Sequence, residues 1–374
     1  MAAPTAPFIA ADSKGAAAAH HGRGRRHVLL FPFPYQGHIN PMFRLAGVLH
    51  RRGFAITVFH THFNAPDPAR HPDYRFVPVP DGMFGPPQVT IEDTFAQIIS
   101  IGDAFETGFR DRLAAVLQEY SRDAVACLVA DAHLLPVFEV ASRLTVPTLA
   151  LRTSSAACHA CFLAYPMLCK KGYLPVQGRC CYSQLDLPVT ELPPYRVRDL
   201  LHIGEAGHHL ACQLVARAVA VANISSGVIL NTFDELERRE LEGLRRDTAV
   251  PVFDIGALRE LRQPGLDEPT GPGGDGVGNR RQLCAVPLGG PSRSRPRMGI
   301  TRYVEHVWKV GLELRGELER GSIEAAIHRL MTDKDGAEMR SRTGELKKAA
   351  VECTSKAGST LMAIDKLVTH IMSL

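Results

Sequence analysis

The sequence lacks any apolar run as long as the ~18 residues that a membrane-spanning helix needs. It contains one Trp and nine Cys among 374 residues, and this cysteine density is far below that of a disulfide scaffold. Charge of one sign is not in excess, because 43 Lys and Arg stand against 39 Asp and Glu, for a net charge of +4. We therefore expect neither a membrane protein nor a partner of nucleic acid.

The first 26 residues also lack the apolar core of a secretory signal. They are acid-poor but contain a single Ser, so a plastid transit peptide is the weaker alternative. We expect 1–26 to be a disordered tail on a reduced, cytoplasmic protein that is a monomer.

Several common catalytic motifs are missing. The first strand–helix turn reads Gln-Gly-His where a dinucleotide site would have Gly-x-Gly-x-x-Gly, and no Gly-x-Ser-x-Gly elbow occurs. Cys158 and Cys161 fall in an expected helix, and no second Cys or His pair completes a zinc site around them or around Cys180 and Cys181. The sequence thus disfavours an NAD enzyme, this type of serine hydrolase and a structural zinc site.

What is present is a regular alternation of strands and helices. Apolar residues make up 45% of the chain, which is enough for a sizeable core. Short apolar runs predict buried strands, and helical spacing between them predicts crossover helices, among them one near 155–169 and one near 205–222. The strands are expected at 28–33, 54–60, 74–80, 125–130, 146–152, 227–231 and 250–256. The pattern favours a doubly wound parallel α/β domain over 27–258.

The pattern changes after this domain. Residues 259–298 are rich in Gly, Pro and Arg and show neither a strand nor a helix period, so we expect an irregular segment. Its Gly274-x-Gly276-x-Gly278 follows no strand and is not expected to bind phosphate. Residues 299–374 regain helical spacing, with helices expected at 302–310 and near 320–332, 336–352 and 358–372.

Two polar residues follow strands of this predicted sheet. His38 lies in the expected turn after the first strand, and Asp131 comes directly after the strand at 125–130. Ligands of open parallel sheets bind beyond the carboxyl ends of the strands, and a His beside a carboxylate can act as a general base. A helix-capping or surface role for His38 stays open from spacing alone. Thr153 and Ser154 follow another strand end, where they line a pocket or cap the next helix.

The residues resemble a known family. HVLLFPFPYQGHINPMFRLAGVLHRRGFAITVFHTHFN, CLVADAHLLP, LRTSSAA, ELPPYRVRDLL, VILNTFDELE and PVFDIGAL are similar, in order, to plant family-1 UDP-glycosyltransferases, above all to the grass benzoxazinone (DIMBOA) glucosyltransferase group. The resemblance covers 27–258 and resumes at 298–374. It implies a GT-B fold with a complete N-terminal, acceptor-binding Rossmann-like domain at 27–258 and a truncated C-terminal Rossmann-like domain whose remnant is 299–374.

The resemblance also implies roles for residues. His38 corresponds to the family's general base and Asp131 to its partner, while Gln36, Gly37, Thr153 and Ser154 are expected to bind substrate. The implied reaction transfers glucose, with inversion, from UDP-glucose to a hydroxyl of a phenolic or benzoxazinone-like metabolite. Neither a metal nor a cofactor is implied, because UDP-glucose is a co-substrate and hydrogen-bond donors can hold its diphosphate.

The sequence departs from the family where the donor sugar binds. The family's Trp-x-Pro-Gln, His-Cys-Gly-Trp-Asn-Ser and Asp-Gln motifs are absent, and the single Trp, Trp308, belongs to a later helix. The chain is roughly 100 residues short of the family's length, about half a domain. We therefore expect a truncated glycosyltransferase with doubtful activity; the alternatives are a non-catalytic small-molecule binding protein and an unstable product.

Overall fold

The computed structural model describes residues 25–80, 91–174, 182–256, 300–313 and 320–374, except positions 202, 204 and 356. The expected irregular segment 259–298 lies outside the described residues, as does the expected disordered tail up to position 24. Arg25 and Arg26, the last residues of that tail, are held in place. Arg25 Nε donates to the carbonyl of Gly53 over 3.0 Å, and Arg26 Nη1 donates to that of Met372 over 3.0 Å.

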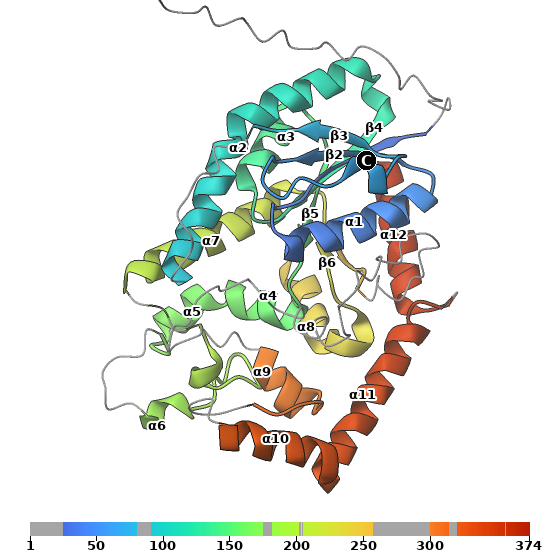
Figure 1. Cartoon of the computed structure of the whole chain (residues 1–374). Helices are drawn as coiled ribbons and strands as arrows, with labels where there is room; N and C mark the ends of the chain where they lie inside the picture. The colour runs from blue at the N-terminus through green and yellow to red at the C-terminus, as the bar shows by residue number, and fades with distance from the viewer. Residues whose placement is uncertain are drawn as a thin grey trace, which may run out of the picture.

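Seven parallel strands form one sheet in the order β3-β2-β1-β4-β5-β6-β7 (Figure 1). Each strand expected from the sequence is present, as listed here: β1 (His27–Phe31), β2 (Ala55–His60), β3 (Arg75–Pro78), β4 (Val125–Asp131), β5 (Thr148–Arg152), β6 (Val228–Leu230) and β7 (Val252–Asp254). Every residue of β1, β4 and β5 is buried, because helices cover both faces of a parallel sheet. The expected α/β class is confirmed.

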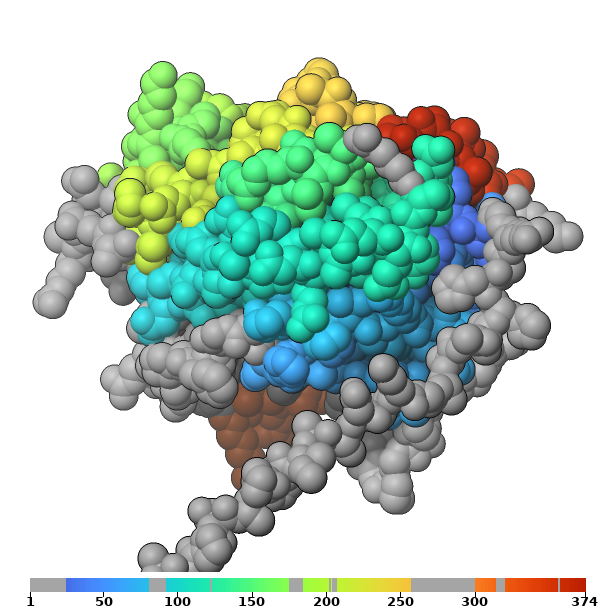
Figure 2. Space-filling model, turned by 90° about the horizontal axis from the view of Figure 1, so that it is seen from above, coloured from blue at the N-terminus to red at the C-terminus, as the bar shows by residue number. Residues whose placement is uncertain are grey.

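Alternate side chains of each central strand point to opposite helix layers. In β1, Leu29 and Phe31 pack with α2 (Ile91–Glu119) and α3 (Leu135–Arg143), and Val28 and Leu30 pack with α1 (Gln36–Arg51) and α12 (Ser359–Ser373). Figure 2 shows α2, in cyan to teal, running across the first of these faces, with α7 (Glu205–Ile224) beside it. The core therefore lies on both sides of the sheet.

Three local expectations need correction. Residues 35–40 were expected as a turn, but α1 already begins at Gln36, so His38 lies in its first turn. The single helix expected near 155–169 is two, α4 (Ala156–Leu163) and α5 (Tyr165–Lys170), and α5 starts at the point where Pro166 cannot continue the α4 ladder. The helix expected near 302–310 is shorter: α9 (Ile300–Arg302) runs into a π-helical turn at Tyr303–Val307.

The C-terminal part is helical in all of its described elements. Figure 1 shows α10 (Arg320–Thr332) and α11 (Lys334–Glu352) as an arm below the sheet, and α12 beside the sheet. Ile364, Leu367 and Ile371 of α12 join the core. In contrast, α10 has no buried residue, and Ile327 is 55% exposed. The described residues of 300–374 thus contain no strand, so they contribute helices but no sheet of a second domain.

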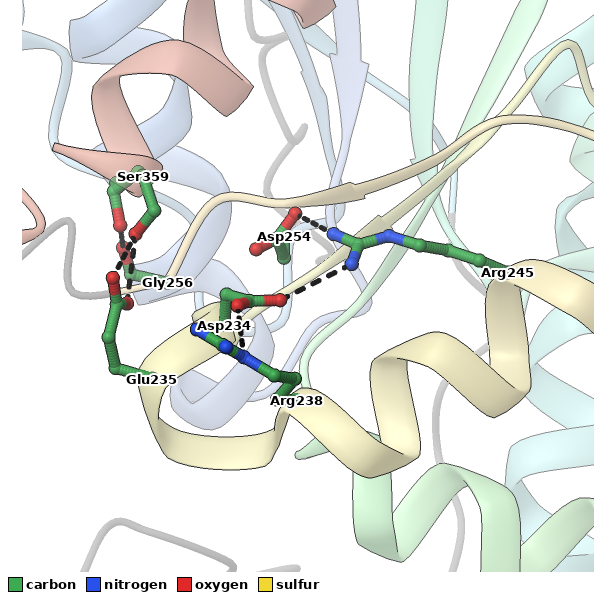
Figure 3. A network of polar contacts seen from close by, with 8 residues as sticks. Asp234, Glu235, Arg238, Arg245, Asp254, Gly256 and Ser359 are labelled. Atoms are coloured by element: carbon green, nitrogen blue, oxygen red, sulfur yellow. Dashed lines mark hydrogen bonds and ion pairs between the residues drawn. The ribbon is translucent and has the colours of Figure 1, made fainter. Parts of the chain in front are cut away.

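Polar contacts hold the end of α8 (Asp234–Asp247) against the edge of the sheet and against α12 (Figure 3). Arg245 forms an ion pair with Asp254 at the end of β7, over 2.5 Å, and a second with Asp234 over 3.4 Å. Ser359 donates to the carboxylate of Glu235 over 2.8 Å. The contact between Ser359 and Glu235 joins segments that are far apart in the sequence.

A buried carboxylate fixes the start of α4. Glu237 is 1% exposed and accepts hydrogen bonds from the backbone N–H groups of Ala156 and Ala157, over 3.1 Å or less, and from the hydroxyl of Thr232 over 2.5 Å. Its backbone leaves the helical region (φ −139°, ψ 40°). The kink in α8 aims this negative charge at a helix N-terminus, where it is favoured.

Glu237→Ala is therefore expected to lower the free energy of unfolding by about 3–5 kcal/mol, because two buried N–H groups lose their acceptor and a space is left behind. The midpoint of urea unfolding measures the loss. Glu242, exposed on the same helix, supplies the control, since Glu242→Ala should change the midpoint little. Equal effects of the two substitutions would contradict this role of Glu237.

Candidate active site

The candidate site lies at the carboxyl ends of three adjacent strands. His38 follows β1 in the first turn of α1, Asp131 ends β4, and Thr153 follows β5. Because these strands are neighbours in the sheet, their ends meet at one edge. Nδ1 of His38 lies 2.7 Å from Oδ2 of Asp131, so the predicted proximity of the two side chains is confirmed.

The protonation of the pair follows from its hydrogen bonds. Asp131 is fully buried, and burial by itself raises the pKa of its carboxyl, but the neighbouring imidazoles of His38 and His133 hold that pKa below its usual range. An ionised carboxylate can only accept, so each imidazole must donate from Nδ1. A neutral His38 then carries a free lone pair on Nε2, which is the form a general base requires.

His133 is a site residue that sequence reasoning missed. Its Nδ1 donates to Oδ1 of Asp131 over 2.7 Å, and its backbone N–H donates to the same oxygen over 3.1 Å. Burial lowers the pKa of this imidazole, and the charge of Asp131 opposes the shift. The available signal was a His two residues after a strand-end Asp, which the sequence pattern does not distinguish from a surface residue.

The guanidinium of Arg152 is a buried cation close to Asp131. Arg152, the last residue of β5, is 6% exposed, and its Cζ lies 5.6 Å from the ring centroid of Phe162. Its Nε has no hydrogen-bond partner among the described residues. Burial lowers the pKa of the guanidinium, the charge of Asp131 raises it, and Arg remains charged. The carboxylate of Asp131 therefore balances a fixed positive charge nearby.

The expected substrate-binding residues fall in two groups. Oγ1 of Thr153 lies 3.3 Å from Nδ1 of His38, and the hydroxyl oxygen of Ser154 is buried without a hydrogen-bond partner among the described residues. The capping role is taken by Ser155, whose hydroxyl accepts from the N–H of Cys158. Gln36 and Gly37 are exposed on the first turn of α1. Their expected binding role stays a prediction.

His159 makes the stability of the fold depend on pH. It is 9% exposed, and burial, assisted by the charge of Arg152, holds its pKa well below the usual value. The unfolded chain therefore takes up the proton first, near the ordinary pKa of ~6.5. Stability is full above that pH and falls as the pH drops toward the folded pKa, by about 1.4 kcal/mol per pH unit for this one group.

Replacing His159 by Phe is expected to flatten the loss of unfolding free energy between pH 6.5 and pH 5, measured by urea titrations at each pH. His133 acts in the same direction, so part of the slope should remain. His209→Asn, at an exposed position, is the control and should keep the wild-type slope. Identical slopes for all three proteins would refute the argument.

Within the described part of the chain, His38, Asp131 and His133 are the one set whose possible metal-ligand atoms lie within 4.8 Å of one another. Both Nδ1 atoms already donate to the carboxylate, which is the arrangement of a proton-transfer site. The absence of a metal stays a prediction. No described helix is long and apolar enough to cross a bilayer.

A separate cavity of about 260 Å³ opens between α8, β7 and α12, and no residue of the His38 group lines it. Its lining includes Asp234, Arg245 and Asp254, whose charges pair with one another. Burial raises the pKa of Asp254, while Arg245 lowers it. Asp234, Arg245 and Asp254 thus offset one another's charge, and Lys366 adds a further cationic side chain to the lining.

The parallel sheet between two helix layers is the architecture of GT-B enzymes, as solved structures with the same fold show. Similar solved structures include Phytolacca americana UGT2 complexed with UDP-2fluoro-glucose and pterostilbene (TM-score 0.68, 18% identity, 93% of this chain and 99% of that chain). A second is a UDP-glucose:anthocyanidin 3-O-glucosyltransferase in complex with UDP (TM-score 0.70, 16% identity, 94% and 100%). At these identities they establish the fold.

Sequence relatives establish the family. The chain is 34% identical to the Zea mays DIMBOA UDP-glucosyltransferase BX8, over 91% of this chain and 98% of the relative, and 34% identical to BX9 of the same plant, over 88% and 92%. No protein-family model matches it. The chain belongs to the plant UDP-glycosyltransferases, as its resemblance to them predicted.

The same comparison bears on the missing donor motifs. The alignment with BX8 runs over 453 positions, although this chain has 374 residues. BX8 therefore carries a long stretch that the present chain lacks. Arabidopsis thaliana UDP-glycosyltransferase 76F2 matches 63% of this chain but 51% of its own length, at 39% identity.

Proposed function

We propose that this chain carries the acceptor half of an inverting UDP-glucosyltransferase, with His38 as general base and Asp131 as its partner. The observation that carries the proposal is the 2.7 Å contact between Nδ1 of His38 and Oδ2 of the fully buried Asp131. It leaves Nε2 of a neutral His38 as a proton acceptor. The carboxylate offsets the charge that the ring acquires when it takes a proton.

The reaction would proceed in one displacement. Nε2 of His38 takes the proton of the acceptor hydroxyl as that oxygen forms a bond to the anomeric carbon of UDP-glucose. The bond from this carbon to the diphosphate breaks on the opposite face, and UDP leaves with the bonding electrons. A single displacement inverts the anomeric centre, so an α-linked donor yields a β-glucoside.

The surroundings of His38 support a flat, aromatic acceptor such as a phenol or a benzoxazinone-like hydroxamic acid. The ring of Phe33 lies 5.3 Å from that of His38 and 5.5 Å from that of Tyr35, which in turn meets Phe63 edge-on at 5.8 Å. Phe63 is 44% exposed. Offset and edge-to-face ring contacts of this kind are favourable for aromatic ligands.

A second candidate function is a small-molecule binding protein without catalysis. It is favoured by the absence of the family's donor motifs from the sequence, which leaves the strand-end site without the residues that would hold UDP-glucose. We propose the same cellular setting for both functions, namely a monomer in the cytoplasm. The described cysteines are free thiols, which suits a reducing compartment.

A thermal-shift titration with simple phenols and cyclic hydroxamic acids tests acceptor binding. We expect these compounds to raise the melting temperature of the purified chain, and His38→Ala to weaken the effect. Calorimetry with UDP-glucose then separates the two functions, because a catalytic chain must bind the donor. A chain that no acceptor stabilises would contradict both functions and support the unstable product.

A further inference from the structure

The carboxylate of Asp131 has two oxygens, and the structure divides them between two imidazoles. Oδ2 faces Nδ1 of His38, whereas Oδ1 receives both the backbone N–H and the Nδ1–H of His133. Both imidazole contacts measure 2.7 Å, which is the distance of a charge-assisted hydrogen bond. No oxygen of this carboxylate is exposed, since Asp131 has 0% accessibility.

We propose that His133 is a positioning residue for the pair formed by His38 and Asp131. Two donors on Oδ1 hold the carboxylate in one orientation, so that Oδ2 always faces His38. This matters because the terminal torsion of an Asp side chain is broad and two-fold. With only one oxygen bound, the carboxylate could turn away from His38 and leave its tautomer undefined.

The ring packing supports the same role. The rings of His38 and His133 meet edge-on, with centroids 5.2 Å apart and an interplanar angle of 79°. Phe33 contacts both, at 5.3 Å and 5.7 Å. The two imidazole rings therefore pack against one another and also donate to the same carboxylate.

Charge also favours a supporting role for His133. Burial keeps the pKa of His133 below its usual value, so this ring is a neutral donor with a single N–H. A neutral donor fixes the carboxylate without cancelling its negative charge. That charge stays available to His38 when the proposed base takes a proton, and the inference therefore rests on the proposed function.

The test is the tautomer of His38, read from the ¹⁵N shifts of its ring in the purified chain. His133→Phe keeps an aromatic ring but removes the donor, and His133→Gln keeps a side-chain N–H. We expect a predominant Nδ1–H form in the wild type, a several-fold rise of the Nε2–H form in His133→Phe, and recovery in His133→Gln. Asp131→Asn, which removes the charge, is the reference for full loss of the preference.

A wild-type tautomer ratio in His133→Phe would overturn the proposal, even if the melting temperature falls, because packing alone would then explain the residue. Tight Zn²⁺ binding by the wild type that His133→Phe abolishes would overturn it too, by making His133 a metal ligand. The readout does not depend on glucose transfer. If the tautomer responds while acceptors fail to bind, the proposed function fails and the positioning role stands.

Discussion

Purified chain incubated with labelled UDP-glucose and a panel of phenols and hydroxamic acids should form glucoside at a rate close to background. The strand-end pair is in place, but the sequence lacks the family's motifs for the ribose, diphosphate and sugar. A general base contributes typically 10²–10⁴-fold, whereas holding two reactants in position contributes about 7–11 kcal/mol. Without a bound donor, the base has no anomeric carbon toward which to direct the acceptor.

The control is a chimera in which residues 257–299 are replaced by the segment of BX8 that joins the counterparts of positions 256 and 300. We expect the chimera to transfer glucose orders of magnitude faster than the chain itself. Turnover by the unmodified chain at the rate of an ordinary glycosyltransferase, abolished by His38→Ala, would show that the missing motifs are not needed.

In the active chimera, Asp131→Asn should lower kcat by about 10²–10⁴-fold. The amide that replaces the carboxylate has no charge to offset a protonated His38, and its N–H group can face Nδ1, which favours the wrong tautomer. Steady-state kinetics with a saturating acceptor measure the loss. Since Asp131 does not reach solvent, KM for the acceptor should change much less than kcat.

Thr153→Val is the matched control at the same strand edge. Its hydroxyl lies 3.3 Å from Nδ1 of His38, so it touches the same imidazole without carrying charge. We expect a loss of less than about tenfold in kcat, in line with one neutral hydrogen bond. If Thr153→Val were as damaging as Asp131→Asn, charge compensation would not explain the role of the carboxylate.

Two helices of the C-terminal part, α10 and α12, differ in how their apolar faces are packed. Ile323 and Ile327 lie on one face of α10 and are 37% and 55% exposed, as expected for a helix that packs on no strand of the described residues. In contrast, α12 packs on the seven-stranded sheet through Ile364 and Leu367. The sequence predicted both helices equally well, since helical spacing does not reveal what an apolar face will meet.

The sequence by itself determined the alternation of strands and helices, the burial of the central strands and the position of His38 and Asp131 at the carboxyl ends of their strands. Short apolar runs can be satisfied only in the interior of a parallel sheet, and such a sheet brings all strand ends to one edge. Local pattern was sufficient because these features repeat at fixed spacing along the chain.

Only the tertiary structure decided how the polar side chains share partners. Three arrangements were visible only in the folded chain. Asp131 accepts hydrogen bonds from two imidazoles, Arg152 is buried near it, and Glu237 anchors a helix that lies 80 residues away in the sequence. A buried charge or hydrogen-bond donor must find a partner in three dimensions, and nothing in the spacing of the residues specifies which one it will be.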